Sequence, residues 1–148
     1  MGIFGKFLKK ENKTEEPQRP ERPTTISYED LLRSVLQRHD LRTDHKGALA
    51  EFEAACSGQP DTAEKFYWLG CLHYTIAGAR KDVAHVDKAI TTFEKALKLK
   101  PDYPLPYKQL IGAYISKRDR GKAISTAKRW LEVDPNNETA KNILSQYS

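Results

Sequence analysis

The chain has 148 residues, 39% of them hydrophobic and 30% charged, and lysine plus arginine exceed aspartate plus glutamate by five. No apolar run approaches the roughly 18 residues of a membrane-spanning helix, and the N-terminus lacks the pattern of a secretory signal. We therefore expect one soluble, cytoplasmic domain. The two cysteines are too few for a disulfide framework, and the net charge is too small to predict nucleic-acid binding.

The first ten residues show a short basic amphipathic pattern that is typical of a membrane or partner anchor. Anionic headgroups would attract each lysine by roughly 1 kcal/mol. A frayed terminus, or a segment that docks on the chain's own domain, is the alternative, because ten residues are marginal as an isolated helix. The apolar and basic residues of this pattern are Ile3, Phe4, Phe7, Leu8, Lys6, Lys9 and Lys10.

Residues 11–26 are predicted to form a disordered linker. From Glu11 to Thr25 the sequence has no aliphatic residue, and three prolines bias it toward polyproline II. Such a segment cannot bury enough apolar surface to offset the entropy lost on ordering.

The remaining residues, 27–148, contain a pattern of two helices that occurs three times. Ala89, Phe93 and Ala96 precede Pro101, and similar series end at Pro60 and Pro135. We call each series of apolar residues at helical spacing that ends at a proline a ladder. An apolar helix precedes each ladder, within 32–36, 66–73 and 107–114. One such pair cannot bury both of its faces, so several pairs must stack into a continuous core.

These residues resemble the tetratricopeptide repeat (TPR), which has Trp-x2-Leu-Gly-x2-Tyr on its first helix and Ala-x3-Phe-x2-Ala before a proline on its second. Phe66, Leu69 and Gly70 match the first motif, and the stretch from Ala89 to Pro101 matches the second. The resemblance implies an all-α, right-handed solenoid of three helix pairs plus a C-terminal capping helix. Its repeats would span 29–62, 63–103 and 104–137, with the cap at 138–148.

The first two repeats depart from this pattern. Leu32 and Leu36 occupy the aromatic and glycine slots of the first repeat, so its first helix is the weakest match. The second repeat carries seven extra residues, because Pro60 and Pro101 lie 41 positions apart rather than 34. The surplus falls around residues 78–87, between the two predicted helices.

The third repeat exchanges the positions of a small and a large residue. Ala127 stands in the phenylalanine slot, and Trp130 stands one turn later in an alanine slot. We expect Trp130 to fill the volume that Ala127 leaves, or to pack under the terminal helix.

The resemblance also implies a concave groove lined by the first helix of each pair. Its centre would be apolar and aromatic, with Tyr67 and Tyr74 as contact rings for an amphipathic helix or an extended peptide. The alternative is that these side chains pack against a neighbouring helix or the chain's own tail. The groove-facing positions are Arg33, Gln37, Glu64, Tyr67, Cys71, Tyr74, Leu105, Lys108, Gly112 and Ile115.

Some members of the family bind the acidic tails of chaperones through lysine, arginine and asparagine side chains that line this groove. The matching positions here are Arg33, Gln37, Trp68, Leu105 and Gln109, and only Arg33 keeps a positive charge. A carboxylate would find too few donors to replace its water. We therefore do not expect chaperone tails as partners.

The sequence contains no motif for catalysis or cofactor binding. His39, His45, His73 and His85 lack the spacing of a metal site, and His73 stands in a tyrosine slot, where packing or hydrogen bonding is expected. There is no Gly-rich phosphate loop and no nucleophile with a histidine in a motif. We expect no enzyme activity, no metal and no cofactor.

The function predicted from these features is a non-catalytic scaffold or adaptor that binds a segment of another protein. Two alternatives stay open: a peripheral membrane adaptor tethered by residues 1–10, and a self-assembling subunit that uses the first repeat or the Trp130 end. The basic run 117–129 is interpreted as a solvated turn and an exposed helix face, and an acidic partner or an anionic membrane is the alternative. Nucleic acid is not expected, because no aromatic stacking platform accompanies these charges.

Overall fold

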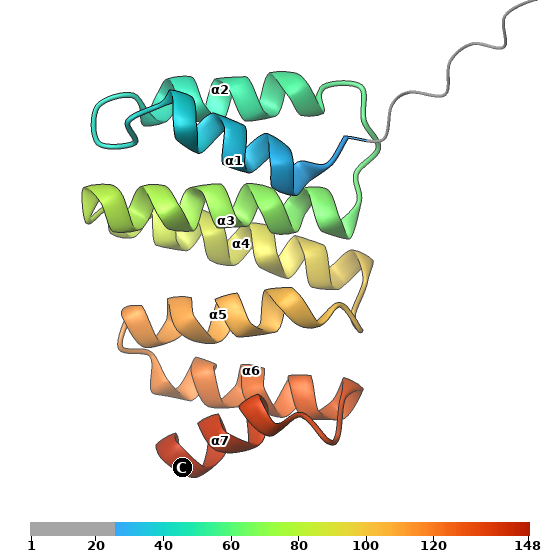
Figure 1. Ribbon diagram of the computed structural model, residues 1–148. Coiled ribbons are helices and arrows are strands. Elements are labelled where there is room, and N and C mark those ends of the chain that lie inside the picture. The colour runs from blue at the N-terminus through green and yellow to red at the C-terminus, as the bar shows by residue number, and fades with distance from the viewer. Residues whose placement is uncertain (1–25) are drawn as a thin grey trace, which may run out of the picture.

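The computed structural model describes residues 26–148, which form seven α-helices and no strand (Figure 1). This confirms the all-α prediction. The predicted amphipathic segment 1–10, and all of the predicted linker except Ile26, lie outside the described residues. The helices are α1 (Tyr28–Arg38), α2 (His45–Cys56), α3 (Ala63–Arg80), α4 (Val83–Leu99), α5 (Pro104–Ser116), α6 (Arg120–Val133) and α7 (Glu138–Tyr147).

The helices stack as antiparallel neighbours along one axis (Figure 1). α3 contacts α1, α2, α4 and α5, and α6 contacts α5 and α7. The stack therefore has the local connectivity of an α-solenoid, in which each pair covers the apolar flank of the next. None of the helices within 26–148 is both long enough and apolar enough to cross a bilayer.

The seven surplus residues lengthen α3 and α4 instead of separating them. These helices have 18 and 17 residues, whereas α5 and α6 have 13 and 14. α3 continues to Arg80, Lys81 turns the chain with a φ of 54°, and α4 begins at Val83. The prediction that the surplus lies between the two helices is therefore wrong. Helical hydrogen bonds pair its backbone groups, which a long loop would leave to solvent.

An aspartate caps the second helix of every pair. The carboxylates of Asp44, Asp82 and Asp119 accept hydrogen bonds from the backbone N–H groups of Gly47, Ala84 and Lys122 at 3.1, 2.9 and 3.0 Å. Each bond satisfies one of the donors that a helix start leaves open. All three caps lie in the turns within pairs, and these turns share one edge of the stack (Figure 1).

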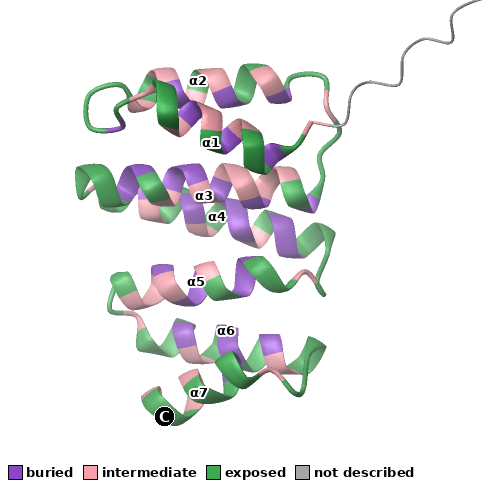
Figure 2. Ribbon diagram, in the orientation of Figure 1, coloured by how far each residue is buried: buried purple, intermediate pink, exposed green. Residues whose placement is uncertain are grey.

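Two apolar clusters form the core, and α3 contributes to both. Figure 2 marks the buried stretches of the helices from which these clusters are built. Leu72 and Ile76 on one side of α3 join the α1–α2 cluster, whereas Tyr67 joins the cluster that continues to α7. The first pair is a complete helix pair despite its weak sequence match, because Leu32 is buried and Leu36 packs half-buried against the same cluster.

The α3–α4 pair packs a glycine against a phenylalanine. A Cβ on Gly70 would lie 2.6 Å from Cε1 of Phe93, closer than real contacts allow, so glycine is what lets the ring approach α3. In the third pair, Ala127 is buried and the Trp130 ring stacks on Tyr107 of α5, with centroids 5.9 Å apart. Trp130 belongs to the same cluster as Ala140 of α7.

Candidate functional site

The first helices of successive pairs are neighbours, since α3 contacts both α1 and α5. In Figure 1, α1 and α3 lie in front of α2 and α4. We call the surface formed by α1, α3 and α5 the first-helix face. It holds the groove positions expected from the sequence.

The structure places most of these residues at the surface and one in the core. Tyr67 is only 6% exposed, and its ring lies 5.9 Å from the Phe93 ring and 5.6 Å from the Tyr103 ring. Burial raises the pKa of its phenol well above the usual range. The prediction that Tyr67 is a contact ring is therefore wrong. Exposed positions are Arg33, Gln37, Glu64, Leu105 and Lys108, and half-buried ones are Cys71, Tyr74, Gly112 and Ile115.

The positive charge of Arg33, on the α1 part of this face, is offset by acidic residues of the same helix. Arg33 pairs with Glu29 at 3.0 Å and with Asp30 at 3.1 Å, all within its own helix. Exposed pairs of this kind contribute little to stability and compete with an incoming carboxylate. Arg33 is therefore less available to donate hydrogen bonds to a partner's carboxylate than its position on the face alone suggests.

Tyr74, Gly112 and Ser116 come together between α3 and α5. The Tyr74 hydroxyl lies 3.1 Å from Oγ of Ser116, which also donates to the Gly112 carbonyl at 2.9 Å. A Cβ on Gly112 would lie 3.5 Å from the tyrosine hydroxyl, an ordinary van der Waals distance, so the contact does not require a glycine here. Tyr74 and Gly112 were predicted from the sequence as groove positions, and Ser116 was not.

Cys71 lies one turn before Tyr74, and its thiol is unreactive at neutral pH. Burial raises the pKa of its thiol to about 11, so the sulfur stays protonated at neutral pH. The thiolate is the reactive form of cysteine. Cys71 is therefore a packing residue of the face.

An open cavity of about 370 Å³ lies where α3 and α4 meet the end of α5. We call it the α3–α4 notch. Tyr74 is the one lining residue that was predicted from the sequence as a contact residue; the others are Ala77, Ser116 and residues of the surplus stretch. The notch is lined by Tyr74, Ala77, Gly78, Lys81, Asp82, Val83, Val86 and Ser116.

A larger cavity, of about 740 Å³, lies between α4 and α6. Ile90, Leu97 and Tyr107 line it, and Arg129 of α6 pairs with both carboxylate oxygens of Glu94 at 2.9 and 3.1 Å. The ion pair joins the two helices beside this cavity. Of these side chains, only Arg129 was considered from the sequence as a contact for a partner, as part of the basic run 117–129.

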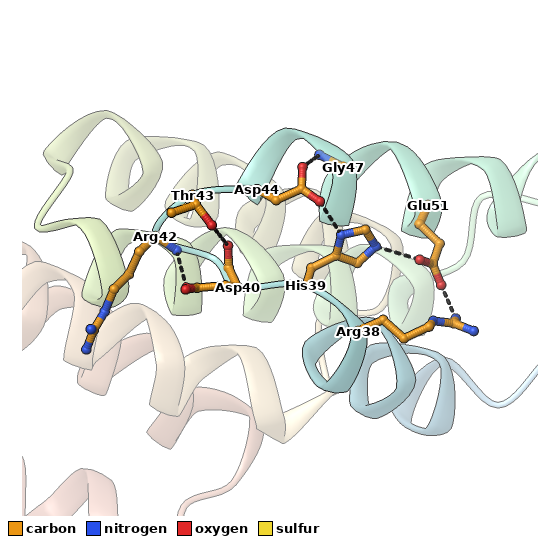
Figure 3. A network of polar contacts seen from close by, with 8 residues as sticks. All are labelled: Arg38, His39, Asp40, Arg42, Thr43, Asp44, Gly47 and Glu51. Carbon is orange, nitrogen blue, oxygen red and sulfur yellow. Dashed lines mark hydrogen bonds and ion pairs between the residues drawn. The ribbon is translucent and has the colours of Figure 1, made fainter.

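His39 fixes the corner between α1 and α2 (Figure 3). Its Nδ1 lies 2.6 Å from Asp44 and its Nε2 lies 2.6 Å from Glu51, which also pairs with Arg38. Glu51 and Asp44 raise the pKa of His39. Because carboxylates occupy both ring nitrogens, this histidine has no free nitrogen to act as a base on a nucleophile.

Three histidines meet near the α3–α4 turn. His73 Nδ1 and His85 Nδ1 lie 3.2 Å apart in the interior, and the ring of His45 approaches His85 edge-on at 5.5 Å. This confirms the prediction that His73 is packed and hydrogen-bonded. Burial is the main cause that lowers the pKa of His73, to about 4, and it also lowers that of His85. Both rings are therefore neutral at pH 7.

The described residues contain no group of three histidine, cysteine, aspartate or glutamate side chains that could hold a metal ion. The His73 and His85 rings point at each other nitrogen to nitrogen, since their centroids are 5.4 Å apart and their nitrogens only 3.2 Å. That geometry suits one shared N–H, with one ring donating and the other accepting.

Comparison with known proteins supports the fold. No protein-family model matches the chain, and neither does any curated protein. Among solved structures, the crystal structure of MamA protein is similar, with a TM-score of 0.58 and 21% identity over 82% of this chain. The chain spans 62% of the length of that structure. At this level of identity the likeness shows a shared fold of stacked helices.

Proposed function

We propose that the protein is a non-catalytic interaction module that binds a segment of another protein on its first-helix face. The observation that carries this proposal is the preformed contact between α3 and α5, where Tyr74 meets Ser116 beside an open cavity. Stacked pairs of this kind are similar to tetratricopeptide arrays, and that analogy of fold supports an interaction role.

The surface chemistry of this face supports the same proposal. Trp68 is half-buried and packs against both core clusters, and Leu105 is 44% exposed at the start of α5. Aromatic side chains held by the core give contact area at a small entropic cost, because their rotamers are already fixed. A rigid helical wall with such residues suits an amphipathic helix or an extended peptide.

The test is capture of partners by the full chain in the cells that make it, by cross-linking and mass spectrometry. The variant L105D/K108E changes two exposed residues of the first-helix face, and K128E is the control on the exposed side of α6. We expect the first variant to lose the partners that the wild type and the control retain. Equal capture by a folded L105D/K108E variant would contradict the proposal.

A further inference from the structure

The α3–α4 notch exists because of the surplus turns. Gly78, Lys81 and Val83 all belong to the stretch that the standard repeat spacing lacks, and Ser116 closes the notch from the end of α5. The notch is therefore a feature of this chain's own insertion.

The notch is open, and its lining combines an apolar part with the charged residues Lys81 and Asp82. Val83 is 60% exposed, the largest value among the exposed large hydrophobic residues within 26–148. Val86 and Ala77 line the same space, and a Cβ on Gly78 would meet nothing within 4 Å. The notch can therefore accept an aliphatic side chain that displaces only water.

The edge of the stack around the notch is strongly basic. The turns within pairs and their flanks, residues 38–46, 80–82 and 117–122, carry nine lysines and arginines against four aspartates. The turns between pairs, 57–65, 98–103 and 132–138, carry three lysines against six carboxylates. This asymmetry would orient an acidic partner toward the notch edge before contact.

The aspartates of this basic edge are already engaged. Asp44, Asp82 and Asp119 cap helices, and the backbone N–H of Arg42 donates to Asp40 at 2.9 Å. Within the described part of the chain, Lys81 makes no ion pair although it lines the notch. An incoming carboxylate would therefore find an ammonium group that is not held in an ion pair, although Asp82 lines the same notch.

A second small cavity continues the edge. Ile115, Arg118, Arg120 and Tyr147 line about 300 Å³, and the Arg120 guanidinium lies 5.8 Å from the centroid of the Tyr147 ring. Arg118, like Lys81, holds a left-handed backbone conformation, with a φ of 59°. Apolar and cationic groups thus alternate from the notch toward the C-terminus.

We propose that the α3–α4 notch binds an acidic segment of a partner protein through an aliphatic anchor, with Lys81 and Lys117 receiving the flanking carboxylates. The proposal rests on the proposed function and names the chemistry of the partner. Lys117 now pairs with Asp87 of α4, so a partner carboxylate would share it. A protein segment is favoured over a flat anionic membrane because the apolar surface is a concavity.

The test measures fluorescence anisotropy of a labelled short peptide of alternating Glu-Glu and Leu-Leu pairs with the full chain. Two reference peptides replace either the glutamates by lysine or the leucines by serine. We expect the first peptide to bind at least about tenfold more tightly than either reference, since one buried aliphatic anchor is worth about that factor. Rising salt should weaken its binding.

Three variants change the notch without disturbing the fold. G78L fills it, V83D places a repelling carboxylate in the favourable first turn of α4, and K81N removes the charge with a residue that tolerates a positive φ. A50L on the exposed side of α2 and K98N on the opposite edge are the matched controls. Each notch variant should weaken the acidic peptide several-fold, and the controls should not.

Equal binding of the peptide to the notch variants and the wild type would overturn the proposal. So would equal binding of all three peptides. Binding to vesicles of equal parts phosphatidylcholine and phosphatidylglycerol without peptide binding would instead assign the edge to a membrane. If L105D/K108E loses its cellular partners while G78L and V83D keep them, the proposed function stands and the notch proposal fails.

Discussion

The α3–α4 and α5–α6 pairs solve the same packing problem with opposite distributions of bulk. In α3–α4 the first helix offers Gly70 and the second fills the space with Phe93. In α5–α6 the matching positions hold Ile111 and Ala127, and all four residues are buried. The comparison shows that the interface requires a summed volume at native packing density, and that either helix can supply it.

The two pairs also differ in length and in polarity. His73 occupies the position that corresponds to Tyr114 of α5. It contacts His85, which lies in the extra turns that α5–α6 lacks. The same extra turns create the notch and place Lys81 at its rim. One insertion therefore brings His85 beside His73 and opens the notch that we propose as a docking surface.

The largest expected effect concerns the exchange of a large and a small side chain between the two helices of a pair. F93A should destabilise the fold by about 3–5 kcal/mol, because it empties the space beside Gly70. G70I should cost about 1–3 kcal/mol by overpacking. Urea unfolding followed by circular dichroism measures both.

The double variant G70I/F93A transplants the α5–α6 arrangement into α3–α4. It should be clearly more stable than the sum of the two single effects, because the new side chain occupies the volume that the ring vacates. Strict additivity of the three unfolding free energies would refute the volume exchange.

The next effect is a loss of stability in acid that is specific to the α3–α4 pair. Because the folded-state pKa of His73 lies near 4 and the unfolded value is about 6.5, the unfolded chain binds more protons between these limits. Stability should therefore fall as the pH drops from about 6.5 toward 4. Urea midpoints across this range measure the loss, and H73Q should flatten the profile. An unchanged profile in H73Q would assign the acid sensitivity elsewhere.

His39 gives the opposite trend at the α1–α2 corner. Its raised pKa means that the protonated form stabilises the fold below about pH 6.5 and that this contribution disappears as the pH rises through the folded value. H39Q should therefore reduce the loss of stability, measured as the urea midpoint, that the wild type shows as the pH rises above about 6.5. Retention of that loss in H39Q would remove the corner as its source.

Two glycines on α3 should respond to alanine with opposite signs. A Cβ on Gly78 meets nothing within 4 Å, so G78A should stabilise the protein by about 0.5–1 kcal/mol through reduced backbone entropy in the unfolded chain. G70A should destabilise it, because its Cβ would lie 2.6 Å from the Phe93 ring. Thermal unfolding of the two variants side by side checks the contrast, and a shared sign would contradict it.

The smallest effect concerns the ion pair between the two helix pairs. Arg129 and Glu94 are 44% and 35% exposed, so R129Q should cost no more than about 1 kcal/mol despite the two-point contact. High salt should reduce the difference from the wild type. A loss well above this range would show that the pair carries stability beyond that of a surface ion pair.

The fold was predictable because its signals are local and repeated. The ladders ending at Pro60, Pro101 and Pro135 follow from helix periodicity and chain termination, which one sequence displays directly. The burial of Tyr67 was not predictable, because it depends on Tyr103, which approaches from the connection before α5. The notch depends on how far α3 and α4 project beyond α5, which no spacing in the sequence states.

The candidate site was therefore predicted only in outline. Tyr74 and Gly112 were identified and do meet between α3 and α5, whereas Ser116 and Val83 were not. The charge asymmetry was present in the sequence throughout. It becomes visible only when the fold assigns each turn to an edge of the stack.

The most direct measurement is hydrogen exchange of the full chain with and without the acidic amphipathic peptide. Binding on the first-helix face at the notch should slow amide exchange in the C-terminal half of α3, the start of α4 and the end of α5, with the exchange of α2 and α6 unchanged. Protection confined to α2, or to the α4–α6 cavity, would contradict the proposed binding surface, and so would no protection anywhere under saturating peptide.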